Sequence, residues 1–284
     1  MSKILKYVAG AIATSLPVSA AFAAWELNMP VGVTELSRDI HGLHMLIFWI
    51  CVLIALAVFG MMIYSLVKFR HSQGAVAAHF DHSTKAEIVW TIIPIAILVG
   101  MAIPAAETLI KIEDTRDSKL SIKVTGYQWK WHYDYLDKNV NFFSTLRRDH
   151  DAARQLHSGV DPNSVPNYLL DVDNPLVVPV NTKVRILLTS SDVIHAWWVP
   201  AFGMKKDALP GFVNELWFNA DVPGTYRGQC AELCGRDHGF MPVVVEVLPQ
   251  DQFDAWLKEH QQPAGAAVAK DTVEPAAQSV AKAE

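Results

Sequence analysis

The first third of the chain is dominated by apolar runs with very few charges. The first run covers residues 7–16, follows Lys3 and Lys6, and leads to the small residues around Ala21 and Ala23. A basic start, a short apolar stretch and a small-x-small site are typical of a secretory signal peptide. We therefore predict cleavage after Ala23; the alternative interpretation is a short first membrane helix.

Two further runs are long enough to cross a lipid bilayer. Residues 46–67 form a stretch of 22 residues without a charge, and residues 88–106 form a second one of 19. About 20 apolar residues span the hydrocarbon core as a helix. Pro94 and Pro104 lie in the second run, and membrane helices tolerate proline where neighbouring groups satisfy the freed carbonyls. The pattern predicts two transmembrane helices.

The charges between these runs predict their orientation. The connecting loop carries Lys68, Arg70 and Lys85, and basic loops stay on the cytoplasmic side. Glu87 stands at the cytoplasmic end of the second run. It is either an interfacial charge or a carboxylate on an ion pathway, because ionisable groups at membrane edges often serve such pathways.

Beyond residue 110 the pattern changes to short β-branched and aromatic segments separated by Pro, Gly and Asn turns. Several such strands predict an all-β sandwich or barrel. We expect residues 141–166 to form a polar, irregular insertion and residues 251–260 a short amphipathic helix, with a flexible tail after them. The predicted strand segments are residues 122–135, 176–180, 183–189, 213–219 and 241–248.

Composition and charge narrow the class of protein. Of 284 residues, 51% are hydrophobic and 19% charged, which argues against a disordered chain and favours a membrane portion. The net charge is −5 and no basic cluster occurs, so nucleic acid is not an expected partner. Three cysteines are too few for a disulfide-built scaffold.

The candidate chemistry lies in a dense set of soft metal ligands near the C-terminal end. Cys230, Cys234, His238 and Met241 follow one another at spacings of four, four and three, and His195 precedes them on another segment. Thiolate, imidazole and thioether ligands favour copper or zinc over hard cations. The pattern therefore indicates a soft-metal site.

Several interpretations of this cluster stay open on the residues alone. The two cysteines could form a disulfide in an oxidising compartment. Together with His195 and His238 they could hold a structural zinc ion, or the His and Met side chains could simply be packed. A mononuclear blue-copper site needs one Cys, so a second Cys favours a dinuclear copper site instead.

Five features together resemble subunit II of haem–copper cytochrome c oxidases, over residues 25–250. They are the two transmembrane runs, the aromatic stretch 126–133, the segment 192–195, the segment 205–211, and the Cys-x-Glu-x-Cys-x3-His-x2-Met cluster at 230–241. The resemblance, to CuA-containing members of the bacterial aa3 type, implies a membrane-anchored all-β protein in which a two-helix transmembrane hairpin precedes a cupredoxin-like β-barrel.

The resemblance also implies a ligand set. Two bridging thiolates would share an unpaired electron between two copper ions, the CuA centre. The ligands would be His195, Cys230, Glu232 (through its main-chain carbonyl), Cys234, His238 and Met241. The Glu232 side chain would help to bind Mg²⁺ or Mn²⁺ at the interface with subunit I.

Four more roles follow from the same resemblance. Trp129 would be the residue through which electrons enter from cytochrome c, although aromatic residues in β-rich runs usually belong to the core. Asp134 and Asp192 would help to dock that cytochrome. Glu87 would lie at the entrance of a proton path. Phe212 departs from the family pattern, in which an Arg is common after Pro-Gly.

The implied function is that of an electron-transfer subunit in a proton-pumping oxidase. Its partners would be subunit I, other oxidase subunits, cytochrome c and the bacterial inner membrane, with the copper domain on the periplasmic side. A copper-free quinol oxidase subunit and a nitrous-oxide or nitric-oxide reductase domain are alternatives; the full ligand set argues against the first. No Cys-x-x-Cys-His occurs, so the cytochrome donor is separate.

The run pattern and the resemblance together predict the organisation of the whole chain. It comprises a signal peptide at 1–23, a periplasmic arm at 24–39, transmembrane helices at 40–67 and 87–110 around a cytoplasmic loop at 68–86, the copper domain at 111–250, and a short helix with a flexible tail at 251–284.

Overall fold

The structure, a computed structural model, describes residues 28–76, 79 and 81–261. The predicted signal peptide and the predicted flexible tail after residue 261 lie outside the described residues.

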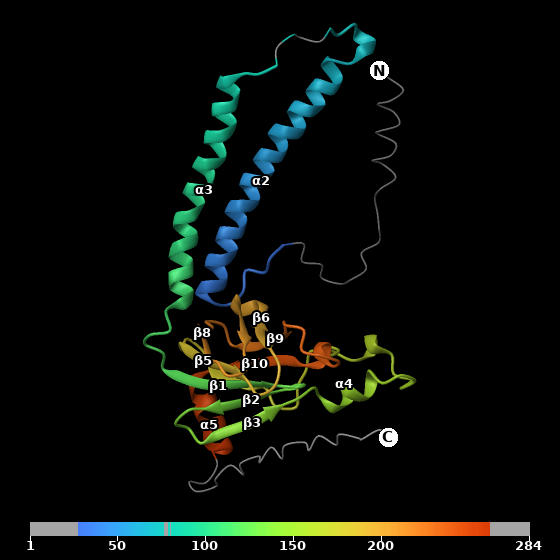
Figure 1. Ribbon diagram of the computed structural model, residues 1–284. Coiled ribbons are helices and arrows are strands. Elements are labelled where there is room, and N and C mark those ends of the chain that lie inside the picture. Colours follow the sequence, from blue (N-terminus) through green and yellow to red (C-terminus); the bar gives the residue numbers. More distant parts are fainter. Residues whose placement is uncertain (1–27, 77–78, 80, 262–284) are drawn as a thin grey trace, which may run out of the picture. The chain divides into compact units, whose positions relative to one another are not determined.

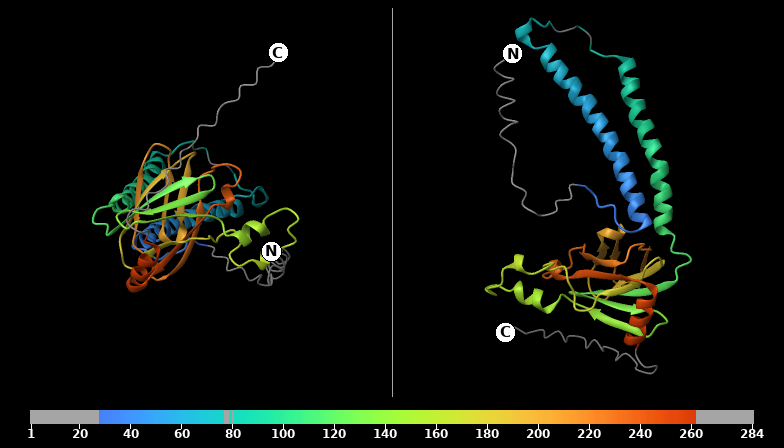
Figure 2. Two further views of the ribbon diagram at one scale, coloured as in Figure 1. Left: turned by 90° about the horizontal axis from the view of Figure 1, so that it is seen from below. Right: turned by 180° about the vertical axis from the view of Figure 1, so that it is seen from behind.

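The two apolar runs form a helical hairpin. Helix α2 (Glu35–Lys68) and helix α3 (Thr84–Glu113) lie side by side, joined by a loop that contains the short helix η1 (His71–Gln73) (Figures 1 and 2). The most apolar stretch of each helix has no buried residue. At 1.5 Å per residue the shorter helix is about 45 Å long, which exceeds the hydrocarbon thickness of a bilayer. Both helices are therefore candidate membrane spans, and both extend beyond the apolar runs.

The start of α2 is fixed to the β domain by hydrogen bonds. Thr34 caps the helix by accepting the Ser37 N–H, and its hydroxyl donates to the carbonyl of Phe202 at 2.8 Å. At the far end of α3, Lys111 forms an ion pair with Asp39 at 2.7 Å. These contacts join both ends of the hairpin to each other and to the domain that follows.

The β domain consists of two five-stranded sheets. One sheet has the order β3-β2-β1-β5-β8 and the other the order β4-β10-β9-β6-β7. In each sheet a parallel pair, β1 with β5 and β4 with β10, accompanies antiparallel neighbours. The strands are β1 (Leu120–Tyr127), β2 (Lys130–Tyr135), β3 (Val140–Ser144), β4 (Leu176–Pro179), β5 (Val184–Ser190), β6 (His195–Val199), β7 (Met204–Ala208), β8 (Asn214–Phe218), β9 (Gly224–Cys230) and β10 (Pro242–Leu248).

The core lies between the two sheets. Strand β5 alternates buried and half-buried positions along its whole length, as a strand with one face on a core does. The larger buried side chains include Trp131, Trp197 and Phe218, and the rings of Trp197 and Phe218 stack at 6.0 Å. The chain thus has the predicted fold class: two apolar helices followed by a cupredoxin-like β-barrel, here flattened into two layers.

The strand boundaries differ from the predicted segments in one place that matters for function. The segment predicted at 122–135 is two strands, β1 and β2, which pair as an antiparallel hairpin. The turn between them holds Gln128 and Trp129. The run conceals this turn because it contains neither Pro nor Asn, and its Gly126 lies within β1 and not in the turn.

The irregular insertion begins later than predicted. Residues 140–144 form β3, which pairs with β2, so the prediction of an insertion from residue 141 was wrong there. Two buried residues, Val140 and Ser144, and the neighbouring pair Phe142 and Phe143 make this stretch a good edge strand despite its asparagines. The insertion, defined from here on as residues 145–175, contains α4 (Arg148–Ala153) and η2 (Pro162–Ser164).

The last described helix packs against the barrel. Helix α5 (Gln250–His260) buries Phe253, and Trp256 contacts Tyr135 with ring centroids 5.4 Å apart. Helices α4 and α5 lie on opposite sides of the β domain (Figures 1 and 2). Strands β6, β7 and β9 were not among the predicted segments, because charges and Gly interrupt the apolar pattern in two of them.

Candidate metal centre

Strand pairing brings the soft ligands of distant segments together. His195 is the first residue of β6 and Cys230 the last of β9, and these strands pair so that Trp197 stands opposite Cys230. The Cys230 N–H donates to the carbonyl of Met241 at 3.0 Å, just before β10 begins. We call residues 230–241 the ligand loop. It starts and ends on neighbouring strands, so its two ends are held rigidly.

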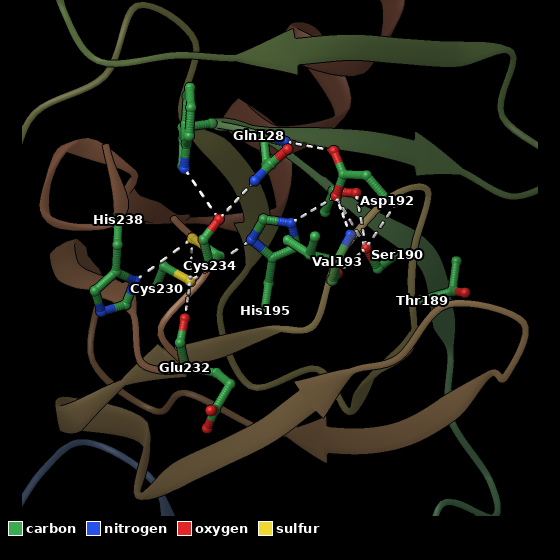
Figure 3. A network of polar contacts seen from close by, with 12 residues as sticks. Gln128, Thr189, Ser190, Asp192, Val193, His195, Cys230, Glu232, Cys234 and His238 are labelled. Atoms are coloured by element: carbon green, nitrogen blue, oxygen red, sulfur yellow. Dashed lines mark hydrogen bonds and ion pairs between the residues drawn. The ribbon is translucent and has the colours of Figure 1, made fainter. Parts of the chain in front are cut away.

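Two thiols and two imidazoles converge at the centre of this site. The sulfur atoms of Cys230 and Cys234 lie 3.8 Å apart. The Nδ1 of His195 lies 3.8 Å from the Cys230 sulfur, and the Nδ1 of His238 lies 3.5 Å from the Cys234 sulfur. The two rings approach the sulfur pair from opposite sides (Figure 3). Each sulfur therefore has an imidazole of its own.

The other two predicted ligands, Glu232 and Met241, lie on the ligand loop. The main-chain carbonyl of Glu232 lies 3.4 Å from the Cys230 sulfur, whereas its carboxylate points away from the sulfurs (Figure 3). Met241 is buried at the end of the ligand loop. Within the described chain, His195, Cys230 and Cys234 form a group whose donor atoms all lie within 4.8 Å of one another. This donor set fits a soft metal such as copper.

The local environment shifts the pKa values of the two thiols in opposite directions. Burial raises the pKa of the Cys230 thiol, but the contacts with His195 and with the main chain near Glu232 and Ala196 outweigh it, so the pKa falls to about 7. Burial and the neighbouring Cys230 raise the pKa of Cys234 to about 12. The local environment therefore favours a thiolate at Cys230 and disfavours a second one beside it at Cys234.

The distances within the cluster test the disulfide and the zinc interpretations of the residue pattern. Sulfur atoms 3.8 Å apart are well beyond the bond length of about 2.05 Å that a disulfide requires. Zinc would use the same four thiol and imidazole donors, but its closed tetrahedral site leaves no place for the Glu232 carbonyl or for Met241. The separate thiols and the nearby Glu232 carbonyl are compatible with copper binding.

Asp192 lies directly behind one of the imidazoles. Its Oδ1 is 2.9 Å from Nε2 of His195, and its Oδ2 accepts the Gln128 N–H at 2.7 Å (Figure 3). A carboxylate in this position fixes the orientation of a ligating imidazole and makes it a better donor. Asp192 thus joins the ligand to the β1–β2 turn, a contact that spacing alone did not reveal.

The β1–β2 turn packs against the ligand loop at the main-chain carbonyl of Cys234. The Gln128 side-chain amide donates to the carbonyl of Cys234 at 2.8 Å, and the Trp129 indole N–H points to the same oxygen at 3.3 Å. Gly235 follows with φ of 118°, and a Cβ there would lie 3.0 Å from the Gln128 side chain. Trp129 is half-buried, so it contacts both the loop and solvent.

Two residues of the site were not predicted as functional, although both lie in the stretch 126–133. Gln128 is one, since amides occur in any turn. Gly126 is the other: a Cβ on it would lie 2.8 Å from the ring of His195, so only glycine lets that ring pack against β1. Trp131 supports the same ring edge-on, with centroids 5.9 Å apart.

Two of the predicted residues lie away from this centre. Asp134 is half-buried on β2, five residues beyond Trp129, or about 17 Å along an extended strand. Glu87 is exposed in the first turn of α3, about 39 Å of helix from its last residue. Neither can act on the sulfur cluster directly.

Two candidate membrane helices, a β domain of two sheets and a cluster of two thiols and two imidazoles define a membrane-anchored protein with a candidate copper site. The comparisons with known proteins agree with this. The family described as "Cytochrome C oxidase subunit II, periplasmic domain" matches residues 120–248, and "Cytochrome C oxidase subunit II, transmembrane domain" matches residues 23–107. The chain belongs to the cytochrome c oxidase subunit II family.

Individual relatives show the extent of the similarity. The probable cytochrome c oxidase subunit 2 of Rickettsia bellii is 41% identical over 234 residues, which cover 82% of this chain and 83% of the relative. The subunit 2 of Cereibacter sphaeroides is 37% identical over 237 residues, covering 80% and 77%. The crystal structure of the periplasmic domain of subunit II from Bradyrhizobium japonicum is 41% identical, with a TM-score of 0.45 over 51% of this chain and 96% of that one.

Proposed function

We propose that this chain accepts electrons from cytochrome c at a dinuclear copper centre and passes them to the haem groups of subunit I. Oxygen reduction to water and proton pumping would then take place in the assembled oxidase. The observation that carries the proposal is the pair of buried sulfurs 3.8 Å apart, each with its own imidazole within 3.8 Å.

Copper held by Cys230, Cys234, His195 and His238 would supply a one-electron acceptor. The protein supplies the rigidity. His195 is held by Asp192, Gly126 and Trp131, and the ends of the ligand loop are fixed in β9 and β10. Ligands that cannot move when the charge changes favour rapid electron transfer, because little reorganisation is needed.

Trp129 is the proposed residue through which electrons enter. It touches solvent on one side, and its indole N–H points at the main-chain oxygen of Cys234 on the other. Asp134 and Asp192 are proposed to attract a basic cytochrome c, since both are partly exposed carboxylates. Glu87 is proposed as the entrance of the proton path, and the outward-pointing Glu232 carboxylate as a ligand of Mg²⁺ or Mn²⁺ shared with subunit I.

The proposed location is the bacterial inner membrane, with the β domain on the periplasmic side and the basic loop in the cytoplasm. Other oxidase subunits and the membrane complete the expected surroundings. A copper-free quinol oxidase subunit would have no use for the buried thiol and imidazole set, so that alternative is disfavoured.

Metal analysis of the full chain in detergent tests the proposal. After copper reconstitution we expect two copper ions per chain and a seven-line hyperfine pattern in the EPR spectrum, because one unpaired electron is shared by two copper nuclei. One zinc ion per chain, or no bound metal, would contradict the proposal.

A second prediction concerns Asp192, which has two separable roles. Asp192→Asn removes a negative charge beside the His195 ring, so the reduction potential of the centre should rise by tens of millivolts, on the order expected for a charge at this range. The on-rate of cytochrome c should also fall and become less dependent on salt, since exposed charges steer association. Redox titration and stopped-flow measurements record the two effects.

Asp134→Asn is the matched control, because Asp134 makes no hydrogen bond to a proposed ligand in the described structure. It should change the salt dependence of association and leave the potential unaltered. If Asp192→Asn and Asp134→Asn shift the reduction potential equally, the contact between Asp192 and His195 has no specific effect on that potential.

A further inference from the structure

The insertion is docked onto the β domain at its base. Arg147 donates to Asp171 at 2.8 Å, and the same carboxylate forms an ion pair with Arg227 of β9 at 3.2 Å. Arg227 lies three residues before Cys230 on that strand. The side chain of Asp171 is only 16% exposed, so these contacts are largely shielded from solvent. The insertion therefore has a fixed position beside the strand that leads into the ligand loop.

A second contact reaches the ligand loop itself. Arg154, at the C-terminal end of α4, places its guanidinium 4.1 Å from the centre of the Phe240 ring. Its Nη1 forms an ion pair with Oδ1 of Asp237 at 3.6 Å, and its Nε donates to Asp151 at 2.7 Å. The Arg154 side chain is 22% exposed and that of Asp237 15% exposed. We call Arg154, Asp237 and Phe240 the clamp.

The clamp holds the part of the loop that carries two proposed ligands. Asp237 immediately precedes His238, and Phe240 immediately precedes Met241. Residues His238–Phe240 form the short helix η4, closed by the hydrogen bond from the Phe240 N–H to the Asp237 carbonyl at 2.9 Å. One turn of this kind has little stability of its own, because so few hydrogen bonds offset its conformational entropy. An external contact is needed to fix it.

The clamp also extends towards Trp129. The second oxygen of the Asp237 carboxylate pairs with Arg236 at 3.2 Å, and the Arg236 guanidinium lies 5.5 Å from the Trp129 ring centre. Arg236 is 81% exposed, so this branch contributes less than the shielded contact with Arg154. Asp237 nevertheless connects the insertion on one side with the proposed electron-accepting residue on the other.

We propose that Arg154 is a positioning residue for the metal centre: through Asp237 and Phe240, the insertion holds η4 in the conformation that directs His238 and Met241 at the copper ions. The inference rests on the proposed copper site. It gives the insertion a function, as an outside support for residues 237–240, which lie between the strand-held ends of the ligand loop.

Hydrogen exchange of the full chain in detergent, without copper, tests this directly. In Arg154→Ala the amides of residues 238–240 should exchange about fivefold to tenfold faster, the change expected from losing one cation–π contact and one partly shielded ion pair. Exchange in the core strand β10 should stay the same, which separates local opening from global destabilisation. Arg154→Lys, which keeps the charge without the planar group, should lie between Arg154→Ala and the wild type.

Arg148→Ala is the matched control. Arg148 is exposed on the same helix, and no ion pair of it is found in the part of the chain described. It should leave exchange in η4 unchanged. If Arg154→Ala fails to fold, Phe240→Leu removes the ring under the guanidinium and should produce the same local acceleration. Unchanged exchange of η4 in a folded clamp variant would overturn the proposal.

The copper-loaded chain gives an independent readout. The hyperfine splittings and the reduction potential should change in Arg154→Ala and not in Arg148→Ala, because only the first change frees His238 and Met241. A wild type without a dinuclear copper signal would refute the proposed function, while the exchange measurements on the copper-free chain would still decide the clamp.

Discussion

Replacing Cys230 by serine should abolish the EPR signal of an electron shared between two copper ions. The Cys230 sulfur lies within 3.8 Å of both the His195 ring and the Cys234 sulfur, and it also meets the Glu232 carbonyl at 3.4 Å. A serine hydroxyl is nearly the same shape but is a hard ligand that stays protonated at neutral pH, so it cannot bridge two copper ions as a thiolate does. One sulfur alone cannot hold both ions in this geometry.

The seven-line pattern should therefore be replaced by the four-line pattern of a single copper, or be lost together with the metal. Cys51→Ser is the control, because Cys51 is an exposed cysteine on α2 and should leave the spectrum unaltered. Met241→Leu should be milder than Cys230→Ser, since a weak axial thioether tunes the potential more than it retains the metal. A seven-line spectrum in Cys230→Ser would mean that the sulfurs do not bridge.

Trp129→Ala should slow the reduction of the centre by cytochrome c far more than it weakens binding. The indole is half-buried against the ligand loop and donates towards the Cys234 carbonyl, so it offers a short route from the surface to a proposed ligand. Losing that contact widens the gap between donor and acceptor, and we expect a rate loss on the order of tenfold or more, as misplaced reacting groups generally give. Stopped-flow reduction at saturating cytochrome c measures it.

The same variant tests whether Trp129 is mainly a core residue. Because the side chain is only partly buried, its removal should cost about 1–3 kcal/mol, less than the 3–5 kcal/mol of a fully buried aromatic residue. Trp129→Phe should keep most of the packing and lose the hydrogen bond to Cys234. A clearly lowered melting temperature with a normal reduction rate would assign Trp129 to the core and remove it from the electron path.

The sequence predicted the main elements of the fold for a simple physical reason. Two charge-free runs of 19 and 22 residues have few other stable environments than a bilayer, and alternating apolar positions such as those of β5 can only face a core. The β1–β2 turn and strand β3 were missed, because their residues are ordinary in both strands and loops. Both depend on hairpin pairing with β2, and the residue types in these stretches do not mark where that pairing begins or ends.

The candidate chemistry of the site is visible in the sequence: residues 230–241 hold two thiols, one imidazole and a thioether, and His195 supplies a second imidazole. The groups that support these side chains become visible only once the chain is folded. Asp192 behind His195, Gly126 beneath the same ring, Gln128 over the Cys234 carbonyl and Arg154 against Phe240 come from segments that chain folding alone brings together. A ligand can be recognised from its own side chain, whereas its support depends on where the backbone of another segment passes.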